Sequence, residues 1–457
     1  MIDHGSSAHS RSRTRWTDRW AERLVKSHLQ TLTHGSLTLH TANGTAHFGE
    51  SAELSAHLYV HHPRFFHRAV LGGRLSIAES YLQGDWDCDD LTSLFRIFVR
   101  NHSSAQRFDR GLARLSELGN RLYHAWHANT RAGSRRNIAA HYDLGNDFYK
   151  LWLDDTLAYS SGIFADAGFS LREASLEKFD RVCRKLHLEE NDEVIEIGTG
   201  WGGFALHAVQ NYGCDVTTTT ISGKQHAVAR QRFDQAALGR KIQLLQQDYR
   251  DLHGQFDKLV SIEMIEAVGH RYLDGFFGTC SRLLRADGTM VLQAIVMPEQ
   301  QYTDYLKSVD FIQRYVFPGG CLPTVGSMLA SAGRATDLRL VHVEDFAPHY
   351  AETLRRWRRS FQDQLGKVRE LGYPEMLIRL WNYYLCYCEA AFEERSVGVV
   401  QIQFDKPRCR RDPLVLSRRA ATVRHPSASM GLRDCATAFP MRATERSDCV
   451  GPAAIRN

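Results

Sequence analysis

The chain has 457 residues, of which 43% are hydrophobic and 10% aromatic, which is the composition of a globular protein large enough for two or three domains. Its ten cysteines are scattered, which argues against a disulfide framework or a metal-binding motif and favours the reduced thiols of a cytoplasmic protein. No apolar run approaches the length of a membrane span, and the polar, basic N-terminus lacks the apolar core of a secretory signal, so any membrane contact is expected to be peripheral.

Residues 1–128 mix short patterned segments with helical ones and are predicted to form a smaller N-terminal domain of mixed structure. The turn and capping residues in this region mark where its elements begin and end. The predicted elements are a hairpin over residues 35–49 with Asn43-Gly44 as its turn, a helix over residues 64–73, and an amphipathic helix over residues 84–101 that opens with aspartates.

A small, basic segment at residues 129–137 is interpreted as a linker, and beyond it the pattern changes to alternating helices and strands. This alternation predicts an α/β fold with a doubly wound, Rossmann-like parallel sheet. Later helical segments are interpreted as insertions or C-terminal additions, and they cover residues 301–317, 352–371 and 375–394. The alternating elements are predicted at residues 171–188 (helix), 193–197 (strand), 203–211 (helix), 214–220 (strand), 223–238 (helix), 242–246 (strand), 257–262 (strand), 272–285 (helix) and 289–296 (strand).

The final segment, residues 408–457, carries ten arginines and four acidic residues but no lysine. It has little periodicity and is rich in proline, serine and alanine, so we interpret it as a basic, disordered tail. Such a tail could also bind anionic lipid head groups at low salt.

The stretch VIEIGTGWGGF, residues 194–204, is an apolar strand that runs into a glycine-rich loop, and Gly198, Gly200 and Gly203 satisfy the G-x-G-x-x-G pattern of dinucleotide sites. A dinucleotide site needs an acid at the end of the next strand, where this chain has threonine, isoleucine and serine. Instead Glu196 precedes the first glycine, and this E-x-G-x-G order is typical of S-adenosylmethionine-dependent methyltransferases. The glycines alone do not exclude two other interpretations, a dinucleotide-binding loop and a tight turn that binds no ligand.

Two further features are compatible with an adenosine site. Ser222 and Gln225 have the spacing of a capping box at the start of the next helix. In QQDYRDL, after the third strand, Asp248 would suit the adenine amino group and Tyr249 could lie along the base, although both could equally belong to a surface loop.

Several long segments resemble the cyclopropane-fatty-acyl-phospholipid synthases and the related mycolic acid cyclopropane synthases. The resemblance extends over about residues 70–407, and GDWDCDDL resembles the lipid-binding N-terminal domain of that family. It implies a catalytic methyltransferase domain at residues 138–407. The segments that carry it are IAAHYDLGNDFYKLWLDDTLAYSSGIF (138–164), VIEIGTGWGGFALHA (194–208), SIEMIEAVG (261–269), DFIQRYVFPGGCLP (310–323) and WNYYLCYCEAAFEERSVGVVQIQFDKP (381–407).

The resemblance implies that the methyl group of S-adenosylmethionine is added to a cis double bond of a phospholipid acyl chain. A carbocation forms, and a bound bicarbonate removes a proton from the added methyl group so that a cyclopropane ring closes. Such a cation needs a site that excludes water. Aromatic side chains between residues 142 and 164, together with Tyr315, Phe317, Trp381, Tyr383 and Tyr384, are predicted either to face it or to pack in the core.

The resemblance also implies the site residues. Bicarbonate would be held by Ser161, Glu266, Gln293, Tyr350 and the backbone of Ile295, with Ser161 in place of a common cysteine and Gln293 in place of a common histidine. These two departures put the outcome of the reaction in doubt. The residues predicted to bind the methyl donor are Tyr159, Ser160, Glu196, Gly198, Thr199, Gly200, Gly202, Thr220, Ile221, Gln225, Asp248 and Tyr249.

Two alternatives remain at this point: a C-methyltransferase that makes methyl-branched or methylene fatty acids, and a lipid-binding relative without turnover. The expected partners are unsaturated phospholipid acyl chains at the inner face of the membrane, and a homodimer is compatible with the sequence. We expect neither a nucleic-acid partner nor a metal site.

Overall fold

The computed structural model describes residues 16–50, 53–101, 129–130, 133 and 145–410. Most of the predicted linker and nearly all of the predicted tail therefore lie outside the described residues, and both remain predictions. We call residues 16–101 the N-terminal lobe and residues 145–409 the C-terminal lobe. Both belong to one compact unit that ends at Cys409.

The N-terminal lobe contains a four-stranded sheet in the order β2-β1-β3-β4. The predicted hairpin is confirmed, because β1 and β2 pair antiparallel, but its turn lies one residue earlier than predicted: Thr41 pairs with Gly44, so Ala42 and Asn43 form the turn in place of Asn43 and Gly44. The helix predicted over residues 84–101 is wrong in its first part: residues 86–88 form a strand, and the helix begins only after Asp90, whose side chain accepts from the backbone N–H of Ser93. The elements are α1 Trp16–Leu29, β1 Ser36–Thr41, β2 Gly44–Phe48, β3 Ser55–Val60, α2 Arg64–Leu71, α3 Gly73–Leu82, β4 Trp86–Cys88 and α4 Leu91–Arg100.

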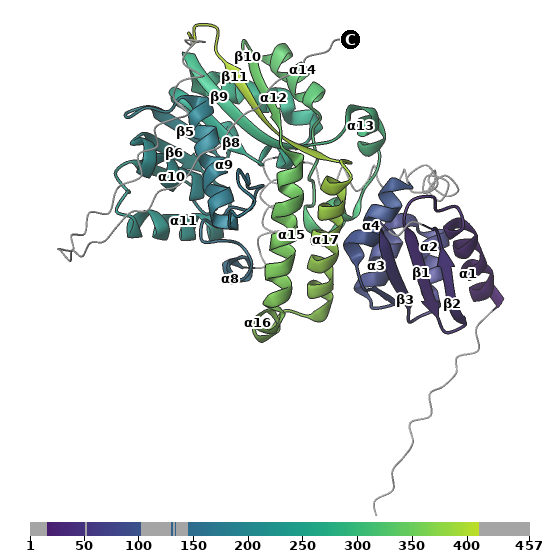
Figure 1. Cartoon of the computed structure of the whole chain (residues 1–457). Helices are drawn as coiled ribbons and strands as arrows, with labels where there is room; N and C mark the ends of the chain where they lie inside the picture. Colours follow the sequence, from purple (N-terminus) through teal and green to yellow (C-terminus); the bar gives the residue numbers. More distant parts are fainter. Residues whose placement is uncertain (1–15, 51–52, 102–128, 131–132, 134–144, 411–457) are drawn as a thin grey trace, which may run out of the picture. The chain divides into compact units, whose positions relative to one another are not determined.

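The C-terminal lobe contains a seven-stranded sheet in the order β10-β11-β9-β8-β5-β6-β7, which confirms the predicted α/β class. Strands β5 to β9 run parallel, and helices cover both faces (Figure 1). Neighbouring residues of β5 show why this strand needs apolar side chains on both of its faces: Val194 packs in the core beneath α9, α10 and α11, whereas Ile195 packs in the core beneath α12 and α14. The elements are α8 Asn146–Lys150, α9 Leu171–Leu186, β5 Glu193–Ile197, α10 Gly203–Tyr212, β6 Asp215–Thr219, α11 Gly223–Gln235, β7 Ile242–Leu245, β8 Phe256–Ile262, α12 Leu273–Leu283, β9 Leu284–Val296, α13 Glu299–Tyr305, α14 Val325–Ala335, β10 Arg339–Asp345, α15 Ala347–Asp363, α16 Leu365–Glu370, α17 Glu375–Glu393 and β11 Gly398–Asp405.

The last third of the chain departs from the prediction. The single helix predicted over residues 301–317 is two pieces, α13 and a π-helical turn at Ile312–Val316. The helix predicted over residues 352–371 starts earlier and is interrupted at Gln364, between α15 and α16. Strands β10 and β11, which pair antiparallel at the edge of the sheet, were not predicted.

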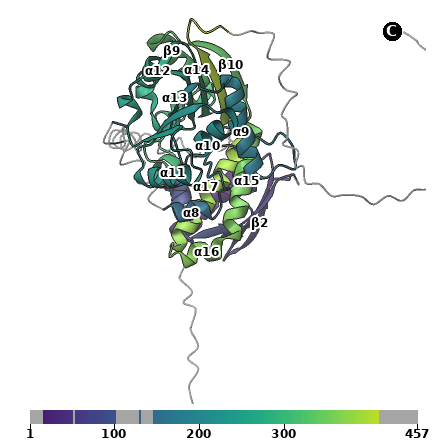
Figure 2. The same ribbon diagram turned by 90° about the vertical axis from the view of Figure 1, so that its left-hand side faces the viewer.

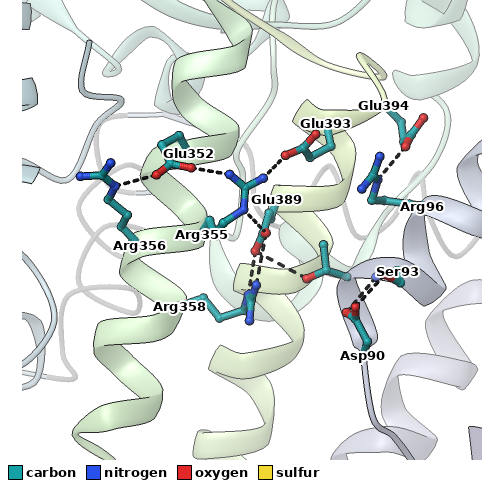
Figure 3. Close-up of polar contacts among 11 residues, drawn as sticks. Asp90, Ser93, Arg96, Glu352, Arg355, Arg356, Arg358, Glu389, Glu393 and Glu394 are labelled. Carbon is teal, nitrogen blue, oxygen red and sulfur yellow. Dashed lines mark hydrogen bonds and ion pairs between the residues drawn. The ribbon is translucent and has the colours of Figure 1, made fainter. Parts of the chain in front are cut away.

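Helices α15 and α17 pack against each other, and α17 also packs against α4 of the N-terminal lobe. Figures 1 and 2 show α16 at the end of this pair that lies away from the seven-stranded sheet. Figure 3 shows a cluster of charged side chains at the junction with α4. The carboxylate of Glu389 accepts from Arg358 Nε at 2.7 Å and lies 3.2 Å from Arg355 Nε, and Arg96 Nε of α4 donates to Glu394 at 2.7 Å. This cluster ties the two lobes together.

Replacing Glu389 by alanine is expected to lower the free energy of unfolding by about 3 kcal/mol. Glu389 is only 2% exposed, and its loss removes the carboxylate that pairs with Arg358 and one of the three that pair with Arg355. Denaturant unfolding of the wild type and the variant measures the effect. The matched control is Glu375→Ala on the same helix, because the Glu375–Arg369 pair is solvent-exposed and should matter little. Equal losses in the two variants would contradict this account of the junction.

Candidate active site

A large cavity of about 1770 Å³ opens where the parallel strands end. Eleven of the twelve residues predicted to bind the methyl donor line it, and the exception is Gly202. Gly202 caps α10 with φ 86°, and a Cβ there would lie 2.5 Å from the ring of Phe233, so its role in this structure is close packing. Gly200 also has a positive φ, of 53°, but a Cβ there would meet nothing within 4 Å. The loop therefore leaves open space at Gly200, which fits a ligand that approaches the backbone closely.

Glu196 lies near the end of β5 and is 2% exposed. Its carboxylate accepts a hydrogen bond from Thr218 Oγ1 at 2.6 Å, and the Thr218 hydroxyl lies 2.7 Å from that of Thr199 in the glycine loop. Burial raises the pKa of Glu196 to about 8. Glu196 thus lines the cavity and also braces the glycine loop against β6.

The predicted capping box at the start of α11 is only half formed. Ser222 Oγ accepts from the backbone N–H of Gln225 at 3.3 Å, but the side-chain oxygen of Gln225 accepts from Thr220 Oγ1 at 3.0 Å instead of facing the cap. This contact holds Gln225 against Thr220, and both residues line the cavity.

Asp248 and Tyr249 also lie on the cavity wall. The Asp248 carboxylate accepts from the guanidinium of Arg250 at 2.6 and 2.8 Å, so an adenine contact there would share the carboxylate with an arginine. The Tyr249 ring packs edge-on against Phe276, with the ring centroids 5.6 Å apart.

The second half of the site centres on Glu263, which the sequence analysis missed. Its Oε1 accepts from the backbone N–H of Ser161 at 2.9 Å and from Gln293 Nε2 at 2.7 Å, and its Oε2 accepts from the Tyr350 hydroxyl at 2.7 Å. Three of the five residues predicted to hold an anion therefore converge on a carboxylate of the chain itself. The Ser161 hydroxyl points elsewhere and donates to the carbonyl of Gly162.

The remaining two predicted residues meet at Glu266, whose Oε1 accepts from the backbone N–H of Ile295 at 2.6 Å. Its Oε2 is buried and has no hydrogen-bond partner among the described residues, and Glu266 lines the cavity. Burial, followed by the neighbouring charge of Glu263, raises the pKa of Glu266 to about 8. Burial also raises the pKa of Glu263, but the donors Tyr350 and Gln293 oppose that rise.

A buried lysine, Lys178, lies close to both halves of the site. The sequence did not predict a role for it. Lys178 of α9 is fully buried, its Nζ donates to Ser160 Oγ at 2.6 Å, and it lies 4.2 Å from the centroid of the Phe179 ring. Burial lowers its pKa to about 8, while the negative charges of Glu263 and other carboxylates oppose that shift. A lysine on a helix usually reaches solvent, but Lys178 lies near Ala174 and Phe179 on the apolar face of α9. That position in the sequence could have identified it as an unusual, buried lysine.

The aromatic residues divide between cavity wall and core. Tyr159 lines the cavity, and its hydroxyl lies 2.9 Å from that of Tyr384. Phe148, Tyr149 and Trp152 pack in the core instead. Tyr142 is outside the described residues. Phe317, Tyr383 and Cys388 also line the cavity, whereas Tyr315 hydrogen-bonds Glu79, Phe164 lies against Arg356, and Trp381 packs in the core.

Two ligands were expected, and the residues fit only one of them. The open glycine loop fits S-adenosylmethionine. Bicarbonate does not fit, because Gln293 Nε2, the Tyr350 hydroxyl and the Ser161 N–H already donate to Glu263. A bicarbonate ion at these donors would also have to displace the Glu263 carboxylate, which carries the same sign of charge.

Comparisons with known proteins point in one direction. The sequence model of the family described as mycolic acid cyclopropane synthetase matches residues 129–402. A tuberculostearic acid methyltransferase of Mycobacterium tuberculosis is 35% identical over 389 residues, covering 83% of this chain and 90% of that protein. The cyclopropane-fatty-acyl-phospholipid synthase of Escherichia coli is 34% identical over 353 residues, covering 77% and 88%. The crystal structure of the mycolic acid cyclopropane synthase CmaA1 complexed with SAH and CTAB superposes with a TM-score of 0.56 at 30% identity, covering 60% of this chain and 98% of that one.

Proposed function

Because the chain belongs to the mycolic acid cyclopropane synthetase family and is an S-adenosylmethionine-dependent methyltransferase, we propose that it transfers a methyl group to a cis double bond in a phospholipid acyl chain and closes a cyclopropane ring. One observation carries this proposal. The same cavity that holds the glycine loop and the two carboxylates continues into the apolar interior of the N-terminal lobe, where Leu37, Leu39 and Leu58 line it. A long apolar chain lying there would reach the methyl donor.

The residues around the reacting centre suit this chemistry. S-adenosylmethionine supplies an electrophilic methyl group when it is bound. The cavity wall supplies the rings of Tyr159, Phe317 and Tyr384, whose faces can stabilise a carbocation. The apolar lining excludes the water that would trap such a cation as an alcohol. A carboxylate at the end of β8 can then accept the proton that must leave.

The rim of the cavity supports a substrate that is taken from a membrane. Leu71 and Phe98 line the cavity and are 59% and 38% exposed, and the exposed Arg74 also lines it. Exposed apolar residues next to a cation suit a lipid surface with anionic head groups. Among the described helices, none is both long and apolar enough to span a bilayer. We therefore propose peripheral binding through the N-terminal lobe.

A second product is favoured by a specific observation. The relative from Mycobacterium tuberculosis is named a tuberculostearic acid methyltransferase, and a 38% identical relative from Pseudomonas putida is named a probable fatty acid methyltransferase. If a hydride first shifts from the methylated carbon to its cationic neighbour, loss of a proton from the added methyl group gives a methylene group instead of a ring. The second candidate is therefore a methylene or methyl-branched acyl chain.

Expression in a bacterium that makes unsaturated but no cyclopropane lipids, followed by mass spectrometry and NMR of its phospholipids, tests the proposal. Ring and methylene products both gain one CH₂, and a saturated branch gains two further hydrogens. The high-field ring protons in the NMR spectrum identify a cyclopropane. Unchanged phospholipids would contradict the proposed function.

The location at the cytoplasmic face of the inner membrane and a homodimer remain proposals. Vesicle co-sedimentation at low and high salt tests whether the protein binds a membrane surface. Binding should weaken at high salt, because salt screens the attraction to anionic head groups. Light scattering of the purified protein tests the dimer, and a monomer mass would contradict it.

A further inference from the structure

We propose that the carboxylate of Glu263 is the proton acceptor of the reaction, in place of the bicarbonate anion that the family resemblance led us to expect. The inference rests on the proposed methylation of an acyl chain, but it applies to the ring-forming and the methylene-forming outcome alike. It assigns a catalytic role to a residue that no sequence motif singled out. It also makes the enzyme independent of dissolved bicarbonate.

The first support is the donor set around Glu263. A carboxylate and a bicarbonate ion present the same pair of oxygens on a planar carbon, so the same donors can hold either one. Here Ser161 N–H and Gln293 Nε2 donate to Oε1 and the Tyr350 hydroxyl donates to Oε2. These are donors that the sequence analysis assigned to bicarbonate, and the chain's own carboxylate uses all of them.

The second support is that neighbouring residues fix these donors. The Gln293 side-chain oxygen accepts from Gln401 Nε2 at 3.0 Å, which turns the amide nitrogen of Gln293 toward Glu263. The ring of Tyr350 stacks on that of Phe392, with the centroids 4.4 Å apart. The acceptor site is therefore preorganised, because its donors do not need to move when a charge is present.

The third support is the backbone of Glu263. It follows β8 with φ 49°, a left-handed conformation that is uncommon for residues other than glycine. Its N–H donates to the carbonyl of Gln293 at 2.9 Å, which holds this turn against β9. The turn places the side chain on the cavity wall beside Glu266. Backbone strain of this kind persists where the surrounding structure enforces it and is concentrated at functional sites.

The step balances without any further reactant. After methyl addition, a C–H bond of the added methyl group breaks and its proton moves to a carboxylate oxygen of Glu263. The electron pair of that bond forms the third bond of the ring, or, when a hydride has first shifted from the methylated carbon to its cationic neighbour, the second bond of a methylene group. The substrate cation becomes neutral and the Glu263 carboxylate becomes a carboxylic acid. Release of this proton to solvent between turnovers restores the anion.

The test measures methyl transfer from S-adenosylmethionine to vesicles of unsaturated phospholipid, with and without bicarbonate. The wild type should keep its full rate in bicarbonate-depleted buffer. Glu263→Gln should lower the rate by about a hundredfold or more, the usual worth of a general base, while its affinity for S-adenosylmethionine and its melting temperature stay close to those of the wild type. Glu375, an exposed carboxylate at the first residue of α17, does not line the cavity, so Glu375→Gln is the matched control and should keep the wild-type rate.

A second variant distinguishes the loss of the carboxylate from a loss of folding. Glu263→Gly suits the left-handed backbone and opens space at the three donors. It should be inactive in depleted buffer and regain activity when bicarbonate or formate is added. A wild type that stops without bicarbonate, a Glu263→Gln variant with near-normal rate, or a Glu263→Gly variant that is active without an added anion would each overturn the inference. A wild type that methylates no acyl chain under any condition would instead refute the proposed function.

Discussion

Replacing Gly200 by valine is expected to weaken the binding of S-adenosylmethionine by about a hundredfold or more, equal to about 2.7 kcal/mol. A Cβ at Gly200 would meet no protein atom within 4 Å and would project into the space along the glycine loop. A branched side chain would occupy the volume that the ligand needs beside the backbone. Isothermal titration with S-adenosylmethionine or its demethylated product measures the change.

The valine also strains the backbone, because Gly200 has φ 53°. Gly372→Val is the matched control: Gly372 has φ 84°, has nothing within 4 Å of an added Cβ, and does not line the cavity. We expect this control to bind the ligand normally while showing a similar loss of melting temperature. Equal loss of binding in both variants would mean that strain, and not occupied space, explains the effect.

Replacing Lys178 by methionine is expected to lower the rate of methyl transfer at neutral pH by about tenfold to a thousandfold. Lys178 is the buried cation whose charge opposes the rise in the pKa of Glu263 and so favours its ionised form, and a neighbouring opposite charge typically lowers a carboxyl pKa by about one to three units. Without it, Glu263 holds its own proton and cannot accept another. In the variant the pKa of Glu263 is higher, so Glu263 loses its proton only at higher pH. The rate of the variant should therefore recover as pH rises. The other titratable groups facing Lys178 or Glu263 are Asp154, Glu196, Glu266 and Tyr350.

A pH–rate profile of both proteins checks this result, with Lys150→Met as control because Lys150 is half exposed and pairs with Asp147 at the surface. The control should follow the wild-type profile. A Lys178→Met profile that is lowered equally at every pH would point to misfolding or lost packing. It would contradict an electrostatic role for Lys178.

The fold was predicted best where its strands are buried on both faces. Strands β5 to β8 and the helices between them appear within a few residues of their predicted ends, because each strand is a short run rich in apolar or β-branched residues that alternates with a helical segment. Strand β10 was missed because nearly every residue in it is exposed, including Leu340 and Val341, so no apolar face marked it. Strand β11 carries Gln401 and Gln403 inside the protein, where their partners come from distant parts of the chain.

The same limit applies to the site. The glycine loop could be predicted because its residues are adjacent in sequence and its conformation demands glycine. Glu263 could not, because its donors come from residues 161, 293 and 350, which only the folded chain brings together. The register of β8 and β9, which places Ile262 opposite Gln293, is what makes the contact. Lys178 was missed for a similar reason, since its partners lie on other elements.

One measurement tests the account most directly. The purified protein is incubated in bicarbonate-depleted buffer with S-adenosylmethionine carrying a fully deuterated methyl group and with vesicles of cis-unsaturated phospholipid. Mass spectrometry then counts the deuterium in each acyl chain. If the added methyl group gives up a proton to Glu263, the product keeps two of the three deuterium atoms and forms without bicarbonate. A product that keeps all three, or no acyl product until bicarbonate is added, would contradict it.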